Sequence, residues 1–293
     1  MSIIEDLKLQ FRIGDVVTKL IFWNVALFAI PSIVFGLLQL FRIHIDFLSY
    51  VSLSSNPIDL LWKPWSIISY AFFHFGIFHI LFNLLMLNFS GRLFVTFFTQ
   101  KQLLSLYFVG AIFAGIIYIV SYMFLPSLAN TNTALVGASA SVMAILFATV
   151  AYSPLMEIRL FLFGNVKLWH IALVLIVVDL IQLPMNNTGG HLAHLGGAFF
   201  GYIYILQLKK GTDICGWFTT ILDALANVFR GKKSVPFKKV HRNYNQPATK
   251  NVSKIVTKNK EQQQIDEILD KISQSGYDSL TKDEKEFLFK SGK

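Results

Sequence analysis

The sequence predicts an all-α membrane protein in which six helices span the bilayer. Of the 293 residues, 54% are hydrophobic, which is more than the apolar share typical of soluble domains. The apolar residues are also gathered into blocks close to the length of a membrane helix, about 20 residues for a hydrocarbon core about 30 Å thick. Core helices of soluble proteins are rarely so long and so uniformly apolar, so we set a soluble fold aside.

Six apolar blocks mark the predicted spans, at residues 17–40, 66–90, 102–125, 134–152, 168–184 and 191–208. The segment before the first block carries acidic residues and lacks a short apolar core, so we expect no cleaved signal peptide. The long, partly apolar connection at 41–65 is expected to lie in the membrane interface. The single cysteine, Cys215, excludes a disulfide within the chain.

The basic residues predict the topology, because Lys and Arg collect on the cytoplasmic side of membrane proteins. They occur before the first span, after the second and fourth spans, and in the tail, where residues 209–260 hold twelve of them against two acidic residues, whereas the opposite connections hold only Arg42 and Lys63. Six spans with both termini in the cytoplasm fit this distribution. The chain has a net charge of +9. We interpret its basic tail as a segment that is attracted to anionic lipid headgroups, and we expect no nucleic-acid partner.

Four parts make up the predicted domain organisation: a cytoplasmic N-terminal segment at 1–16, the six-span core at 17–208, a basic amphipathic and linker segment at 209–260, and a small helical element at 261–293. In the third part, residues 216–229 indicate a short amphipathic helix and residues 250–260 a polar linker. In the last part, helical spacing of apolar residues, a stop at Gly276 and a cap at 279–281 predict a helical hairpin.

Strongly polar side chains inside spans are costly and therefore mark functional candidates. Three predicted spans carry them in clusters: His74, His79 and Asn83 in the second, Gly137-Ala138-Ser139-Ala140-Ser141 in the fourth, and residues 190–197 with His191 and His194 in the sixth. These spans run in the same direction and each cluster lies in the first half of its span. The clusters are thus expected at one depth, around a shared cavity that water can enter.

The residue types in these clusters point to serine-protease chemistry. A serine hydroxyl needs a base, usually a neutral histidine, and Ser139 and His194 offer that pair from neighbouring helices. His79 and Asn83 are four residues apart and share a helix face, so with the Ser139 backbone N–H they are candidate donors to an oxyanion. His74 lies on a different side of the helix and is expected to shape the outer rim.

Small residues predict the contact that brings the pair together. Gly137 and its small neighbours thin the start of the fourth span, and Gly197 and Gly201 form a GxxxG pattern on the sixth. We interpret the remaining polar residues, Ser141, His191 and His170, as neighbours or interfacial groups.

Asp179 is the only acidic residue within a predicted span. It offers a third member for the site, but nothing local in the sequence ties it to His194, and a dyad suffices. Its assistance to the dyad stays an open alternative. The predicted chemistry requires no metal and no cofactor.

Three motifs resemble those of the rhomboid family of intramembrane serine proteases: HFGIFHILFN at 74–83 resembles its second-span signature, GAS at 137–139 its GxSG motif, and AHLGGAFFG at 193–201 its AHxxGxxxG motif. The resemblance covers about residues 15–210 and implies a six-helix rhomboid-like bundle. It implies that Ser139 is the nucleophile, His194 the base, and His79 and Asn83 the oxyanion donors. It also implies a membrane-embedded first loop and a substrate gate at the fifth span.

The chain departs from the family pattern at three places. Ala140 replaces the second glycine of GxSG, and Trp65-Ser66 stands where the family often has Trp-Arg, so the first loop lacks that arginine as an anchor. Met143 stands where an aromatic ring often stacks on the base. None of these changes removes a catalytic group.

The predicted reaction is hydrolysis of a peptide bond in or near the membrane segment of a single-span protein. One alternative is a rhomboid-like protein that binds membrane clients without cutting them. Another is a metalloprotease, although His191 and His194 form HxxH without the glutamate of HExxH. A transporter would show broken helices and internal repeats, which we do not see. We expect a bacterial inner membrane as the location, and the sequence does not specify an oligomeric state.

Overall fold

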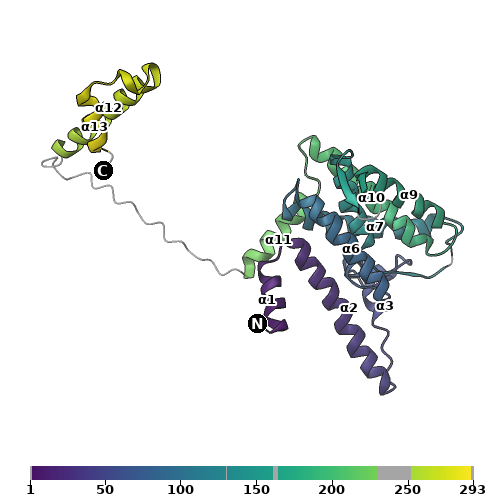
Figure 1. The fold of residues 1–293 in the computed structure, drawn as a ribbon. Helices are drawn as coiled ribbons and strands as arrows, with labels where there is room; N and C mark the ends of the chain where they lie inside the picture. The colour runs from purple at the N-terminus through teal and green to yellow at the C-terminus, as the bar shows by residue number, and fades with distance from the viewer. Residues whose placement is uncertain (1, 130, 161–163, 230–251, 292–293) are drawn as a thin grey trace. The chain divides into compact units, whose positions relative to one another are not determined.

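The structure is a computed structural model that describes residues 2–129, 131–160, 164–229 and 252–291. The chain divides into two compact units, residues 1–232 and 233–293, and each is built of helices (Figure 1). The first unit contains α1 (Ile3–Ile13), α2 (Val16–Leu40), α3 (Leu48–Val51), α4 (Asp59–Trp62), α5 (Ser66–Ser69), the 3-10 turn η1 (Tyr70–Phe72), α6 (Ile77–Val95), α7 (Gln100–Phe124), α8 (Ser139–Tyr152), α9 (Leu168–Gln182), α10 (Thr188–Lys209) and α11 (Gly216–Phe229).

Two pairs of short antiparallel strands accompany the helices: β1 (Leu53–Ser54) pairs with β2 (Ala134–Leu135), and β3 (Glu157–Leu160) with β4 (Gly164–Lys167). The first pair joins the connection after α2 to the segment before α8, with Leu53 opposite Leu135. This strand pair therefore holds the entry to α8 in place.

Three helices of the described chain, α2, α6 and α7, are long and apolar enough to cross a membrane. The helices α8 and α9 are apolar but shorter, with 14 and 15 residues. The first, third, fifth and sixth predicted blocks each coincide with one helix, α2, α7, α9 and α10. The count of six crossings remains a prediction.

The predicted start of the second span is wrong. Residues 66–72 form α5 and η1, Phe73 is extended, and α6 begins only at Ile77 after Gly76. Two tyrosines fix this earlier segment to α7, because Tyr70 donates to the Ala111 carbonyl and Tyr107 to the Ala71 carbonyl, each at 2.7 Å. The segment is apolar because it is buried within the protein, and composition alone does not separate that case from a span.

The fourth predicted span also begins too early. Residues 134–135 belong to β2, and α8 begins at Ser139 itself. The backbone reaches this point through Gly137, whose φ of +128° lies in the region that side chains disfavour. Ser139 is therefore the first residue of its helix, whereas the predicted span, which began at residue 134, placed it five residues inside.

The helix α7 lies at the centre of the first unit and α2 at its edge (Figure 1). Twelve residues of α7 are buried, whereas α2 buries only Val17, Leu20 and Asn24. An apolar helix with so little protein contact leaves most of its surface for another apolar environment. Lipid is the environment that fits such a surface in a membrane protein.

Hydrogen bonds to backbone carbonyls hold the first loop in a defined shape. Trp65 Nε1 donates to Tyr50 and Lys63 Nζ to Ser49, both at 2.8 Å, and Ser69 Oγ donates to Val51 at 2.7 Å. The loop is thus anchored although Ser66 replaces an arginine that the family often has. These particular hydrogen-bond partners were not predicted from the sequence.

The second unit is a helical hairpin, as predicted, formed by α12 (Val252–Ser275), the turn η2 (Tyr277–Ser279) and α13 (Lys282–Ser291). Gly276 ends the first helix with a φ of +77°, and Thr281 and Glu284 cap the second through reciprocal hydrogen bonds. The polar linker expected at 250–260 is wrong from Val252 onward, where α12 has begun. The predicted amphipathic helix at 216–229 is confirmed as α11.

Candidate active site

Ser139 lies at the N-terminus of α8, at a point where two neighbouring groups fix the backbone. The Gly137 N–H donates to the Tyr70 carbonyl at 2.9 Å, and the Ala138 N–H donates to His74 Nε2 at 3.4 Å. The first N–H groups of a helix have no acceptor within the helix. The Ser139 N–H is one of these groups, so it is available to a ligand beside the Ser139 hydroxyl.

His194 reaches Ser139 from α10. Its Nε2 lies 2.6 Å from Ser139 Oγ, within hydrogen-bond distance. The contact is possible because α8 and α10 pack closely. A side chain at Gly197 would collide with the Ala140 carbonyl, and one at Gly201 with the Ala144 carbonyl. The structure thus brings together the two residues that the sequence paired.

Asp179, near the end of α9, completes a chain of polar contacts. Its Oδ1 lies 3.0 Å from His194 Nδ1 and 2.7 Å from His191 Nδ1. The contact of Asp179 with His194, which the sequence left open, is thus present in the structure, and His191 is more than a neighbour. Asp179 is 6% exposed, so this carboxylate lies in the interior between α9 and α10.

Two cavities of about 260 Å³ each meet at Ser139, His194 and Asn83. One has further polar walls, including His79 and Asn187, and the other is lined mainly by apolar side chains of α6, α8 and α9. A bound chain could thus place polar backbone on one side of Ser139 and apolar side chains on the other.

His79 and Asn83 occupy the α6 wall of the polar cavity, as their shared helix face predicted. The Asn83 amide donates one hydrogen to the His79 carbonyl at 2.8 Å. An amide NH₂ carries two hydrogens, so the second is left for another acceptor. His79 Nε2 lies close enough to Gly137 that a Cβ there would be 2.8 Å from it, which places the imidazole against the segment that leads to Ser139.

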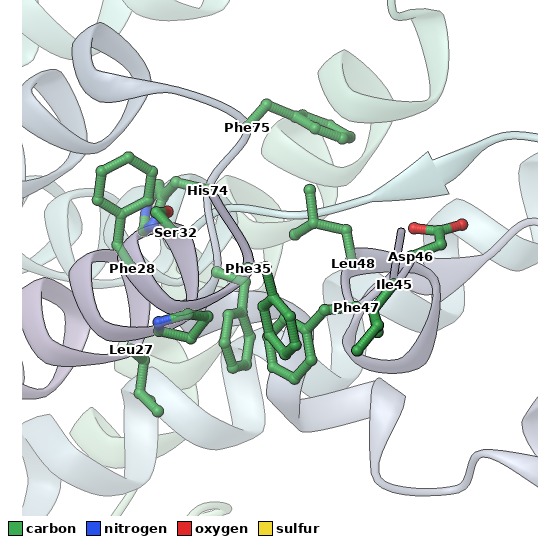
Figure 2. A pocket seen from close by; sticks show the side chains of 12 residues that line it. Leu27, Phe28, Ser32, Phe35, Ile45, Asp46, Phe47, Leu48, His74 and Phe75 are labelled. Carbon is green, nitrogen blue, oxygen red and sulfur yellow. The ribbon is translucent and has the colours of Figure 1, made fainter. Parts of the chain in front are cut away.

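His74 is buried, 3% exposed, and its Nε2 accepts from the Ala138 N–H, so it supports the segment before Ser139 and does not form an exposed rim as predicted. On its other side lies a cavity of about 270 Å³ between α2, the first loop and residues 73–75 (Figure 2). Phe35 and Phe47 stack on the wall of this cavity, with ring centroids 4.9 Å apart. Neither Ser139 nor His194 lines it, so it is separate from the candidate site.

The other polar residues of the sequence hypothesis lie apart from the Ser139–His194 contact. Ser141 is fully buried, and its hydroxyl has no hydrogen-bond partner among the described residues. His170 lies near the opposite end of α9 from Asp179, exposed beside Trp169. Met143 lines the apolar cavity, in keeping with a packing role.

Asp179, His191 and His194 also form a set of ligand atoms that lie within 4.8 Å of one another. Two imidazoles and a carboxylate are donors that suit zinc. The distances of 2.7 and 3.0 Å from Asp179 Oδ1 to the two Nδ1 atoms are also hydrogen-bond lengths. Hydrogens on the two imidazoles therefore satisfy the carboxylate equally well. Two chemistries are thus compatible with the site: a serine nucleophile activated by His194, and a zinc ion held by this cluster. Experiment separates them.

Comparison with known proteins gives two family matches. Residues 61–210 match the model of the rhomboid domain, and residues 256–290 match a family of unknown function (DUF6576). The chain is 27% identical over 157 residues to RHOMBOID-like protein 12, mitochondrial, of Arabidopsis thaliana. It is 30% identical over 139 residues to presenilin-associated rhomboid-like protein A, mitochondrial, of Danio rerio.

These similarities are partial in length. The two alignments cover 50% and 46% of this chain and 47% and 35% of the respective relatives, so the chain spans at most about half the length of the relatives it matches. The rhomboid match includes α6 to α10 and so contains every residue of the candidate site from His74 to Gly201.

Proposed function

Because this chain belongs to the rhomboid family of membrane proteins, we propose that it is a serine endopeptidase that cleaves membrane proteins, with Ser139 as nucleophile and His194 as general base. The observation that carries the proposal is the 2.6 Å contact between His194 Nε2 and Ser139 Oγ. Two residues 55 positions apart, on separate helices, meet at a point where two cavities join. A base within hydrogen-bond reach of a hydroxyl is the arrangement that nucleophilic catalysis requires.

In the acylation step, Ser139 Oγ attacks the scissile carbonyl carbon while its proton moves to His194 Nε2. The carbonyl π electrons pass to oxygen, which becomes an oxyanion. When the carbonyl re-forms, the C–N bond breaks and His194 gives its proton to the leaving amine. The product of this step is an ester between Ser139 and the N-terminal part of the substrate.

In the deacylation step, water attacks the ester carbonyl and gives its proton to His194 Nε2. The second tetrahedral intermediate collapses, the bond from carbon to Ser139 Oγ breaks, and His194 returns the proton to that oxygen. The peptide leaves with a new carboxyl group. Each proton is thus carried by His194, and the enzyme returns to its starting form.

Three donors are proposed for the oxyanion: the Ser139 backbone N–H, the His79 side chain and the second hydrogen of the Asn83 amide. The first is supported by its position at the start of α8, and the other two by their place on the wall of the polar cavity. Donors fixed before the reaction cost no reorganisation when the charge develops.

The membrane arrangement is also proposed. We infer six crossings with both termini in the cytoplasm, substrates with a single span, and entry beside α9, where the apolar cavity lies. The basic segment at 209–260 is proposed to face anionic headgroups, and its residues 230–251 lie outside the described part of the chain. The two named relatives are mitochondrial, so they lend no support to the expected bacterial inner membrane.

The proposal is tested by cleavage of a model single-span substrate in detergent by the wild type, Ser139→Ala and His194→Ala. Ser141→Ala and His170→Ala are matched controls, because they remove the same groups from α8 and from a neighbouring helix away from the contact. We expect cleavage by the wild type and both controls and none by the first two variants. Cleavage that persists in Ser139→Ala would contradict the mechanism.

A wild type that binds single-span proteins but cleaves none of them would support the alternative of a rhomboid-like client-binding protein. The names of both relatives describe them as rhomboid-like. A pull-down of the same substrate by the same variants distinguishes the two functions, because binding without chemistry has no requirement for the Ser139 hydroxyl.

A further inference from the structure

Asp179 is a buried carboxylate that joins two histidines of the neighbouring helix. It is 6% exposed, and its Oδ1 lies 2.7 Å from His191 Nδ1 and 3.0 Å from His194 Nδ1. A buried carboxylate is costly unless it is hydrogen-bonded, and these two contacts satisfy it. Its placement at this point of α9 therefore calls for an explanation.

The contact with Asp179 determines which nitrogen of His194 carries hydrogen. An ionised carboxylate only accepts hydrogen bonds, so His194 Nδ1 must be the donor. In the neutral imidazole the other nitrogen, Nε2, is then an unprotonated acceptor, and this is the atom that lies 2.6 Å from Ser139 Oγ. The carboxylate thus selects the tautomer that can accept the serine proton.

His191 hydrogen-bonds to the Asp179 carboxylate as well. It is buried, 8% exposed, and its Nδ1–H donates to the same Oδ1 that His194 contacts. One turn of α10 separates the two histidines, so both face α9. The His191 donor holds the carboxylate oxygen in line with His194 and compensates part of its charge.

We propose that Asp179 is the positioning residue of His194, so that the site acts as a Ser139–His194–Asp179 triad in which His191 holds the carboxylate. This inference rests on the proposed protease function and goes beyond the dyad that family resemblance implies. During acylation, Asp179 stays ionised and stabilises the imidazolium that His194 becomes, and no proton passes to Asp179.

A purely structural role is the main rival. In that case Asp179 fastens α9 to α10, and its loss weakens the fold without a specific effect on the base. The variant Asp179→Asn separates the two roles, because the amide has the same size and keeps an acceptor oxygen. Its NH₂ group can donate to His194 Nδ1, which favours the tautomer with hydrogen on Nε2, and that tautomer cannot take the serine proton.

The experiment combines kinetics with the tautomer of His194 in the full chain in detergent. We measure kcat and KM for a single-span substrate, and the rate at which a fluorophosphonate probe labels Ser139, for the wild type, Asp179→Asn and the α9 control His170→Asn. Nitrogen NMR of ¹⁵N-histidine-labelled protein reports the tautomers, with the His194 signals assigned by their loss in His194→Asn.

The proposal expects kcat of Asp179→Asn to fall on the order of 10²- to 10⁴-fold, with KM changed little and probe labelling slowed in parallel. It expects His194 of the wild type to carry hydrogen on Nδ1 and to lose that preference in the variant. His170→Asn is expected to match the wild type. A kcat within threefold of the wild type would overturn the proposal.

Two further results would also overturn it. One is a His194 that carries hydrogen on Nε2 in the wild type, a measurement that holds even where Asp179→Asn fails to fold. The other is a loss of activity in Asp179→Asn that accompanies a lower melting temperature, is recovered on cooling, and leaves the His194 tautomer unchanged. That combination is expected if Asp179 only holds α9 to α10.

The role of His191 is tested by a matched pair of variants. His191→Asn keeps a nitrogen donor near the place of Nδ1, whereas His191→Phe keeps the ring and removes the donor. We expect kcat to fall more for His191→Phe than for His191→Asn, and equal values would contradict the role. If the wild type cleaves nothing, the protease function fails, while the NMR measurement still decides the positioning of His194.

Discussion

Gly201 of α10 lies directly against the backbone carbonyl of Ala144 in α8, with no space between them for a side chain. One turn earlier, Gly197 is packed in the same way against the Ala140 carbonyl. The partner in both contacts is main chain, which cannot move aside as a flexible side chain does. These contacts set the distance between the helices that carry His194 and Ser139.

We therefore predict that Gly201→Ala destabilises the protein by about 1–3 kcal/mol and abolishes cleavage, because the two helices must separate. Alanine favours a helix over glycine by up to about 1 kcal/mol, so the clash must outweigh that gain. Thermal unfolding in detergent and substrate cleavage measure the two effects. Gly36→Ala is the control, since a Cβ at Gly36 meets nothing within 4 Å, and an equal response of both variants would contradict the prediction.

Gly137 controls the position of His79. Its φ is +128°, and an added Cβ would lie 2.8 Å from His79 Nε2. We predict that Gly137→Ala lowers kcat by roughly 10²- to 10³-fold, the effect of losing one oxyanion donor, because the methyl group displaces the imidazole. Steady-state kinetics of Gly137→Ala, His79→Ala and the double variant form a cycle. The double variant is expected to be no slower than the slower single variant, and fully additive losses would show that the two residues act separately.

The sequence was sufficient for the parts of the site that depend on composition and spacing. Apolar blocks located α2, α7, α9 and α10, and the polar clusters inside them singled out Ser139, His194, His79 and Asn83. Hydrophobicity could not place the start of α6 or α8, because the segments that precede them are apolar for a different reason. They are buried beside α7 and the first loop, where tyrosine hydroxyls and strand pairing satisfy their backbone.

Asp179 was left open for a physical reason. Its contact with His194 joins α9 to α10. The loop between these helices contains Asn187 in a left-handed conformation with φ of 53°, and no periodic pattern predicts how two helices joined in this way face each other. A usable signal was nevertheless present. The predicted fifth span runs opposite to the sixth, and Asp179 lies close to its outer end. The same comparison of depths that grouped Ser139 with His194 therefore places Asp179 beside them.

The C-terminal hairpin is predicted to weaken in acid. The Lys271 ammonium and the Thr281 backbone N–H both donate to the Glu284 carboxylate, and they hold its pKa down at about 2, against an ordinary value of 4.5. A lowered pKa in the folded state means that the stabilisation is present above pH 4.5 and is lost as the pH falls toward 2. Hydrogen exchange of residues 252–291, corrected for the intrinsic rate at each pH, is expected to rise across this range. Glu284→Gln should exchange faster at neutral pH and lose this part of the pH dependence, and a wild-type rate unchanged from pH 5 to 2.5 would contradict the prediction.

Chelation separates the two chemistries that the cluster around Asp179 admits. If Asp179, His191 and His194 act through the protons between them, cleavage should be the same before and after prolonged dialysis against EDTA or phenanthroline, since His194 carries each transferred proton and no step of the proposed mechanism uses a metal. A zinc metalloprotease in the same detergent serves as the control for effective chelation. Loss of cleavage on dialysis with recovery on addition of Zn²⁺ would instead favour a metal-activated water as the nucleophile. Under that outcome Ser139→Ala should retain activity, so the chelation result and the Ser139→Ala result must agree on one chemistry.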